Sequence, residues 1–119
     1  MAKHNEIGEL GEQIAQKYLQ AQEYRILTTN WRWGKGEVDI IAQKGEVLVF
    51  VEVKTRTNNN FGQPEEAVTT KKQQLFYELA VEYMYQINYE QEFRFDIIAI
   101  VLEPKQDIQH YQDAFFPTW

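Results

Sequence analysis

Residues 36–55 read GEVDIIAQKGEVLVFVEVKT, and the rest of the fold is arranged around them. Two apolar runs flank the Lys44-Gly45 pair, and this pattern predicts a β-hairpin. The second run is apolar on both faces, which is typical of a central strand covered on both sides. Its polar end, Glu52-Val53-Lys54, is unusual there, because charges at the end of a buried strand are costly unless they are paired or bound to a metal.

The segments on either side of this hairpin complete an α/β pattern. Apolar residues at helical spacing predict a helix over 5–21 and a second helix after Pro64, whose strongest part is 70–86 with Thr69 or Thr70 as its cap. β-rich runs predict strands over 24–33, 37–43, 46–55, 93–102 and, more weakly, 108–116. A polar loop at 57–63 precedes the second helix. The order α-β-β-β-α-β-(β) predicts one domain, residues 1–119, with a central mixed sheet flanked by helices. The helical crossover should make strands 46–55 and 93–102 parallel.

Composition sets limits on the class of protein. The 119 residues are 44% hydrophobic and include no cysteine, so one core is expected and disulfide or thiolate metal sites are excluded. The longest apolar run, residues 97–102, is far shorter than the roughly 20 residues that span a membrane. No apolar run follows the N-terminus, so we expect no signal peptide and a cytoplasmic protein.

The formal charge of −6 is unevenly distributed. Residues 1–60 hold eight basic and eight acidic residues, whereas residues 61–119 hold four and ten. An acidic protein is a poor general binder of polyanions. Carboxylates that hold a divalent cation would reverse the local sign, and the acidic second half favours a protein partner as an alternative.

The hairpin register decides whether the polar residues meet. A two-residue turn at Lys44-Gly45 places Asp39 opposite Phe50. Directly opposed residues share a face, and Glu52 and Lys54 lie on that same face. Asp39 and Glu52 then become diagonal neighbours about 7–8 Å apart. A register shifted by one residue would turn Asp39 to the other side.

Two carboxylates and a lysine suit phosphodiester hydrolysis. Mg²⁺ or Mn²⁺ takes oxygen ligands, stabilises charge on a phosphoryl oxygen and lowers the pKa of bound water. The lysine supplies a point charge for the phosphate or the nucleophile, or it handles a proton. The alternative for Glu52 and Lys54 is a surface ion pair that contributes little.

Asp39, Glu52 and Lys54 match the D…(D/E)-x-K pattern of the restriction-endonuclease-like superfamily, also called PD-(D/E)xK nucleases, although Val38 replaces the proline of that name. Over residues 5–115 the chain also resembles the YraN family of small, nuclease-like bacterial proteins. The matching residues are GELGE at 8–12, Ala15, Asn30, Arg32, GEVD at 36–39, VEVKTR at 51–56, Gly62, Lys71 and Phe95-Asp96. The resemblance implies a restriction-endonuclease-like fold.

The resemblance also implies roles for individual residues. Asp39, Glu52 and the Val53 carbonyl would bind the cation. The chain is more distantly similar to archaeal Holliday junction resolvases, which place a glutamate on the first helix, and Glu12 would be its counterpart. The alternative for Glu12 is a solvated position on the flank of the helix. Gln73 and Tyr77 fit the Q-x-x-x-Y pattern of RecB-type nucleases.

Other polar and aromatic residues have weaker assignments. Arg32, Arg56 and Lys71 are candidate phosphate contacts, with solvated charges as the alternative, and Glu37 is a candidate accessory residue. Trp31 and Trp33 either stack on nucleotides or pack in the core or an interface. We expect Asp96 to be structural, paired with Arg94 or a loop.

The sequence therefore favours a Mg²⁺-dependent nuclease that acts on DNA, with branched or single-stranded DNA as possible substrates. The alternative is a nucleic-acid-binding or adaptor domain that keeps the fold and does little chemistry. A homodimer is a further option, motivated by a set of aromatic residues expected to be exposed: Tyr83, Tyr85, Phe115, Phe116 and Trp119.

Overall fold

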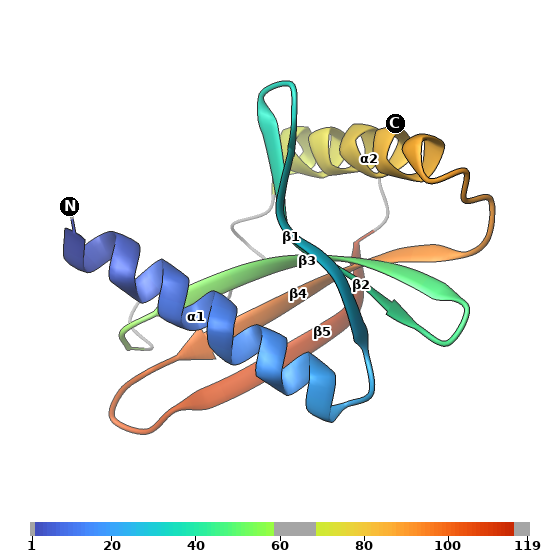
Figure 1. The fold of residues 1–119 in the computed structure, drawn as a ribbon. Helices are drawn as coiled ribbons and strands as arrows, with labels where there is room; N and C mark the ends of the chain where they lie inside the picture. Colours follow the sequence, from blue (N-terminus) through green and yellow to red (C-terminus); the bar gives the residue numbers. More distant parts are fainter. Residues whose placement is uncertain (1, 59–68, 116–119) are drawn as a thin grey trace.

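A five-stranded mixed sheet lies between two helices in the computed structural model, which describes residues 2–58 and 69–115 (Figure 1). The chain order confirms the predicted α-β-β-β-α-β-(β) arrangement and makes the last segment a full strand. The elements are α1 (Ala2–Ala21), β1 (Arg25–Trp33), β2 (Gly36–Lys44), β3 (Val47–Arg56), α2 (Thr70–Gln86), β4 (Phe93–Val101) and β5 (Asp107–Phe115). Residues 59–63 of the predicted polar loop lie outside the described residues.

The strands are ordered β1-β2-β3-β4-β5 across the sheet. β3 and β4 are parallel, as the helical crossover predicts, and the other neighbours are antiparallel. β3 is thus a central strand, which explains why its sequence is apolar on both faces.

The two helices cover opposite faces of the sheet (Figure 1). Alternate residues of β3 show this, because Leu48 and Phe50 pack in the cluster that contains α2, whereas Val49 and Val51 pack in the cluster that contains α1. Full burial of an aliphatic or aromatic side chain contributes about 1.5–3 kcal/mol. The helical residues of these two apolar clusters are Ala15 and Leu19 of α1 and Phe76, Leu79, Ala80 and Tyr83 of α2.

Helix α2 coincides with the strongest part of the predicted second helix, and residues 65–68 after Pro64 lie outside the described residues. Thr69 is extended and its hydroxyl accepts a hydrogen bond from the Lys72 amide at 3.2 Å, which satisfies one of the amides at the start of the helix. The apolar stripe then faces the sheet. This cap fixes the first turn of α2 and so places the side chain of Lys72.

The β2–β3 hairpin differs from the prediction in its register. The turn is at Gly45-Glu46, with Gly45 at a φ of 60°, and Lys44 pairs with Val47. The predicted turn at Lys44-Gly45 is wrong by two residues in register. Because this shift is even, the side chains keep their faces, and Asp39 moves from opposite Phe50 to opposite Glu52.

The pairing of β2 with β3 ends at Ile40 and Val51. Beyond this point each strand stays paired only with its other neighbour. β2 continues to Gly36 in its pairing with β1, while β3 continues to Arg56 in its pairing with β4. Figure 1 shows the β1–β2 hairpin rising out of the sheet towards α2, where the Trp31 and Tyr83 rings lie 5.2 Å apart. We call the region where β2 and β3 part the strand fork.

Asp96 of β4 is structural, as predicted. Its carboxylate, with no exposed surface, accepts hydrogen bonds from the Arg94 guanidinium (2.9 and 3.2 Å) and from the Asp113 amide (3.0 Å). His110 Nε2 lies 2.7 Å from it, and the same ring contacts the Tyr18 hydroxyl at 3.0 Å. Asp96 therefore links β4 to β5 and, through His110, to α1.

The aromatic residues that motivate a homodimer are not all exposed. The expectation of an exposed Tyr83 is wrong, because its ring is buried against Trp31 and Phe50. Phe115 is half-buried and stacks on Phe95. Tyr85 is 81% exposed, and Phe116 and Trp119 lie outside the described residues. In the described part of the chain, no helix combines the length and apolar character needed to cross a membrane.

Candidate functional site

Two carboxyl groups meet at the strand fork. Asp39 is the first residue of β2 beyond the last pair, and Glu52 is the first residue of β3 beyond it. Their side chains share a hydrogen bond, and the Val53 amide donates to Asp39 Oδ2 at 2.8 Å. The two carboxyl groups can meet because β2 and β3 part at this point. If the strands stayed paired, backbone hydrogen bonds would occupy the same space.

The contact changes the charge of the pair. Burial raises the pKa of Asp39, and the hydrogen bond and charge of Glu52 raise it further, to about 8. The raised pKa favours a proton shared between the Asp39 and Glu52 carboxyl groups at neutral pH. The pair carries one negative charge, where two separate surface carboxylates would carry two.

Helix α1 brings Glu12 to the same place. A Cβ atom on Gly11 would lie 1.7 Å from Thr55 Oγ1, so glycine allows α1 to pack directly on β3. Burial raises the pKa of Glu12, a hydrogen bond with the Asn30 side chain opposes the rise, and the charges of Glu37 and Glu52 add to it. Glu12 is thus close enough to the pair to sense its charge.

A pocket of about 220 Å³ joins these groups. Asp39, Glu52 and Glu12 supply carboxyl oxygens to it, and Val53 lines it as well. The N–H and C=O of one strand residue leave the strand on the same side, so the Val53 carbonyl faces the side where its amide meets Asp39. The full lining is Ile7, Gly8, Glu12, Asp39, Glu52, Val53 and Thr55.

The donor set of this pocket fits a hard divalent cation with remaining water ligands. Carboxylate and carbonyl oxygens are the ligands that Mg²⁺ and Mn²⁺ prefer. A cation would replace the proton that Asp39 and Glu52 share. Among the described residues, no group of three or more His, Cys, Asp or Glu side chains is arranged to hold a metal ion unaided. Glu12 would have to leave Asn30 to join the pair.

Two lysines lie beside Glu52. Lys72 Nζ is 3.1 Å from Glu52 Oε2, and the Lys54 and Lys72 side chains contact each other. Burial lowers the pKa of Lys54, the charge of Glu52 opposes this change, and Lys72 adds to it. For Lys72 burial acts against the charged form, but the charge of Glu52 and the contacts with Lys54 and Glu52 leave its pKa raised.

Lys72 is the residue of this cluster that the sequence analysis did not single out. Its neighbour Lys71, predicted as a phosphate contact, is exposed and lines a groove along α2 that Lys72 lines as well. The sequence does contain a signal for Lys72. It lies four residues before Phe76, so it falls on the buried face of α2 one turn closer to the start of the helix.

The other predicted contacts are not among the residues that line the pocket. Arg32, whose side chain is 78% exposed, donates from Nε to Glu37 at 3.1 Å, so Glu37 is tied to β1. Arg56 is half-buried at the end of β3. Gln73 is half-buried, and its backbone N–H donates to the Thr69 carbonyl in the first turn of α2.

Tyr77 and the tryptophans belong mainly to the packing of α2. The Tyr77 ring packs 6.5 Å from that of Phe93, which pairs with Leu48, four residues before Glu52 on β3. The structure therefore places Tyr77 on α2, half-buried against the core cluster. Trp31 is packed there too, whereas Trp33 at the hairpin tip is 48% exposed.

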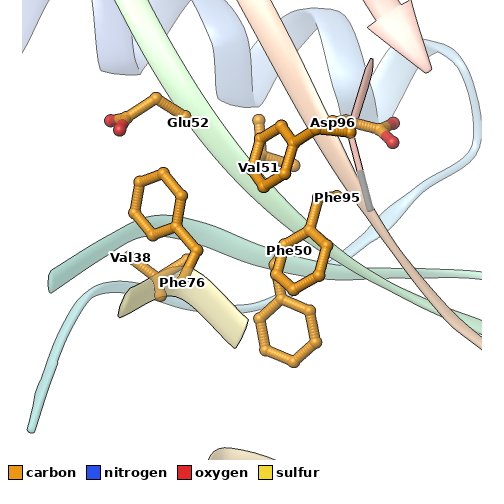
Figure 2. Close-up of a pocket in the computed structure, with 8 residues that line it drawn as sticks. Val38, Phe50, Val51, Glu52, Phe76, Phe95 and Asp96 are labelled. Carbon is orange, nitrogen blue, oxygen red and sulfur yellow. The ribbon is translucent and has the colours of Figure 1, made fainter. Parts of the chain in front are cut away.

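An aromatic layer lies beneath the acidic pair. Figure 2 shows Phe76 and Phe95 around a small cavity, with the Glu52 and Asp96 carboxylates pointing away from the rings. The cavity, about 10 Å³, has room for one water at most. Glu52 lines one wall of this cavity, so its side chain starts from the packed core and its carboxylate points away from it.

Together the fold and the site define a small α/β protein with an acidic pair and two lysines at a fork between adjacent strands. The chain belongs to the family described as "Uncharacterised protein family UPF0102", also called YraN, whose model matches residues 11–100. This confirms the family resemblance in the sequence.

Relatives in several bacteria match almost the whole chain. It is 46% identical to a UPF0102 protein of Flavobacterium psychrophilum, over 98% of both chains. It is 45% identical to UPF0102 proteins of Christiangramia forsetii and Bacteroides thetaiotaomicron, again over 98% of each chain. These matches span all the elements that build the strand fork.

Proposed function

We propose that this protein is a Mg²⁺- or Mn²⁺-dependent nuclease that hydrolyses DNA phosphodiester bonds, with branched or single-stranded DNA as candidate substrates. The observation that carries the proposal is the meeting of Asp39, Glu52, Glu12 and Val53 in one pocket beside Lys54. This is the donor set that the D…(D/E)-x-K resemblance implies.

Each residue has a role that follows from its position. Asp39, Glu52 and the Val53 carbonyl would hold the cation, and Glu12 would hold it or its waters. Such a cation supplies positive charge to a phosphoryl oxygen and to the attacking water. Lys54 orients that water or offsets the charge that develops on the phosphate. The water oxygen bonds to phosphorus and gives up a proton to solvent, the bond from phosphorus to one bridging oxygen breaks, and the leaving oxygen takes a proton from solvent.

Basic residues near the fork would hold the DNA backbone. Arg32, Arg56 and Lys71 are the candidates, and the exposed Trp33 beside Arg32 offers a ring on which an unpaired base can stack. Their local positive charge would counter the overall −6 of the chain.

The test is cleavage of labelled single-stranded, duplex and four-way-junction DNA in Mg²⁺, Mn²⁺ or EDTA. We expect cleavage of at least one form, lost in EDTA and reduced by at least about 100-fold in Lys54→Ala. Lys105→Ala, in the turn between β4 and β5, is the matched control and should cleave like wild type. Wild-type activity in Lys54→Ala would remove Lys54 from the mechanism.

A second candidate function is a nucleic-acid-binding or adaptor domain without catalysis. The lack of a ready three-residue cation site among the described residues favours it, as does the acidic second half of the chain. DNA binding that is unchanged by chelation and by Asp39→Asn, without cleavage of any form, would select this function. Capture of a basic protein through residues of the second half would point to the adaptor role.

A further inference from the structure

The Lys72 ammonium occupies the position where a cation would neutralise Glu52. It lies 3.1 Å from Glu52 Oε2, and the Glu52 side chain is only 12% exposed. A carboxylate so shielded needs a positive partner, and Lys72 supplies it when no metal ion is bound. Lys72 and a cation on the same carboxylate repel each other, so the two compete.

The position of Lys72 is fixed by its helix. The Thr69 cap bonds to the Lys72 amide, and Phe76, one turn further on, is buried. The ammonium also lies 5.6 Å from the centre of the Phe76 ring. The backbone of Lys72 is therefore held while its long side chain, 36% exposed, can swing towards solvent.

Glu52 faces two lysines that differ in how they are held. Lys54 comes from the same strand, two residues further on, and it moves with β3. Lys72 reaches in from α2 across the pocket edge. If Glu52 takes up a cation, the chain can release Lys72 without disturbing the sheet.

We infer that Lys72 is a displaceable counter-ion, which neutralises Glu52 in the metal-free protein and transfers to a phosphate of the DNA backbone when a divalent cation takes its place. The inference rests on the proposed function, because it requires both a cation and a phosphate at this site. Lys72 would thus pair first with Glu52 and then with a DNA phosphate, and this change of partner couples cation binding to substrate binding.

The two roles predict effects of opposite sign for one substitution. Removing the ammonium in Lys72→Met removes a competitor, so the free protein should bind Mn²⁺ about three- to tenfold more tightly. The same change removes a phosphate contact, so DNA binding in Ca²⁺ should weaken by about tenfold. A residue that only supports the fold would weaken both.

The experiment measures Mn²⁺ affinity by titration calorimetry and DNA affinity by fluorescence anisotropy, in wild type, Lys72→Met, Lys72→Arg and the control Lys105→Met. Lys72→Arg keeps the charge and should bind DNA within about threefold of wild type. Lys105→Met should match wild type in both measurements. Thermal melts of the metal-free proteins show that each variant is folded.

The outcomes separate this inference from the proposed function. Wild type that binds Mn²⁺, with Lys72→Met binding it no more tightly, overturns the inference and leaves the metal site standing. Weaker binding of both ligands in Lys72→Met also overturns it. If neither wild type nor Lys72→Met binds Mn²⁺, the metal site and the inference fail together. Mn²⁺ binding that appears or tightens in Lys72→Met, with weaker DNA binding, supports it.

Discussion

Two aspartates on neighbouring parts of one sheet have opposite ionisation. Asp96 is surrounded by donors from Arg94, His110 and the Asp113 amide, and although burial acts against ionisation, these hydrogen bonds hold its pKa below the ordinary value. Asp39 has one backbone donor and a carboxyl neighbour, and its pKa is raised to about 8.

The surroundings of these two aspartates distinguish a buried acid that supports the fold from one that is available to bind a ligand. The Asp96 cluster is complete, because each carboxylate oxygen already has donors from the chain. The strand fork is incomplete, because Asp39 and Glu52 still share a proton although Lys72 pairs with Glu52. A buried acid whose partners are supplied by the fold stabilises it, whereas one left beside another acid costs stability and offers a binding site.

The largest effect is expected from Asp96→Ala. This change leaves Arg94 and His110 without their buried partner, and we expect a loss of about 3–5 kcal/mol in the free energy of unfolding. Urea denaturation at pH 7 measures it. Asp107→Ala, at the exposed start of β5, is the control and should change stability by less than about 0.5 kcal/mol. Equal effects of the two variants would show that the Asp96 cluster adds nothing.

Asp39→Asn should have the opposite sign in the metal-free protein. Its folded pKa of about 8 exceeds the ordinary 3.8, so the folded state retains a proton that the unfolded chain releases. The stability from this proton is full below about pH 4 and is lost as pH rises through about 8. Asparagine stays neutral and can still donate to Glu52, so we expect it to stabilise by about 1–3 kcal/mol at pH 9.

Thermal melts of both proteins between pH 5 and pH 9 check this prediction. The melting temperature of wild type should fall relative to Asp39→Asn as pH rises. Mn²⁺ should raise the melting temperature of wild type and leave that of Asp39→Asn nearly unchanged. A constant gap between the two proteins across this pH range would contradict the shared proton.

The fold was predictable because its signals are local and consistent. Hydrophobic period and the threonine cap place the second helix at 70–86, as found, and the helical crossover gives the parallel pair. Register was harder, because Gly45 suits a turn at Lys44-Gly45 or at Gly45-Glu46, and the two choices give the same alternation of faces. Only tertiary pairing separates them.

The candidate site was predictable where residues lie on adjacent strands. Asp39 and Glu52 follow from any register that keeps their faces, although the structure brings them directly opposite each other. Lys72 depends on how the first turn of α2 meets β3, which spacing within β3 does not reveal. Tyr83 was misjudged because its partner, Trp31, lies on a hairpin that folds back over α2.

Gly11→Ala tests whether the close packing of α1 on β3, and not a hydrogen bond, positions Glu12 at the strand fork. The added Cβ would lie 1.7 Å from Thr55 Oγ1, so α1 must shift and carry Glu12 with it. We expect a loss of about 1–3 kcal/mol, measured by urea denaturation, and weaker Mn²⁺ binding. Thr55→Ala in the same protein should restore part of both.

Gly8→Ala is the matched control for this change. A Cβ at Gly8 meets nothing within 4 Å, and alanine favours a helix over glycine by about 1 kcal/mol. The control should therefore be neutral or slightly more stable than wild type. Similar losses in both variants would mean that the close approach at Gly11 is unimportant for stability.

The smallest effect on stability is expected from Arg32→Ala, which breaks an ion pair at the open end of the fork. The Arg32 side chain is 78% exposed, so water screens its pair with Glu37, and its removal should cost less than about 1 kcal/mol. An exposed guanidinium that holds a phosphate would nevertheless matter for DNA, because each such contact releases counterions. Anisotropy titrations from 50 to 200 mM salt should give a log–log slope smaller by about 1 in the variant. An unchanged slope would assign Arg32 to the hairpin alone and leave the fork without a phosphate contact on its β1 side.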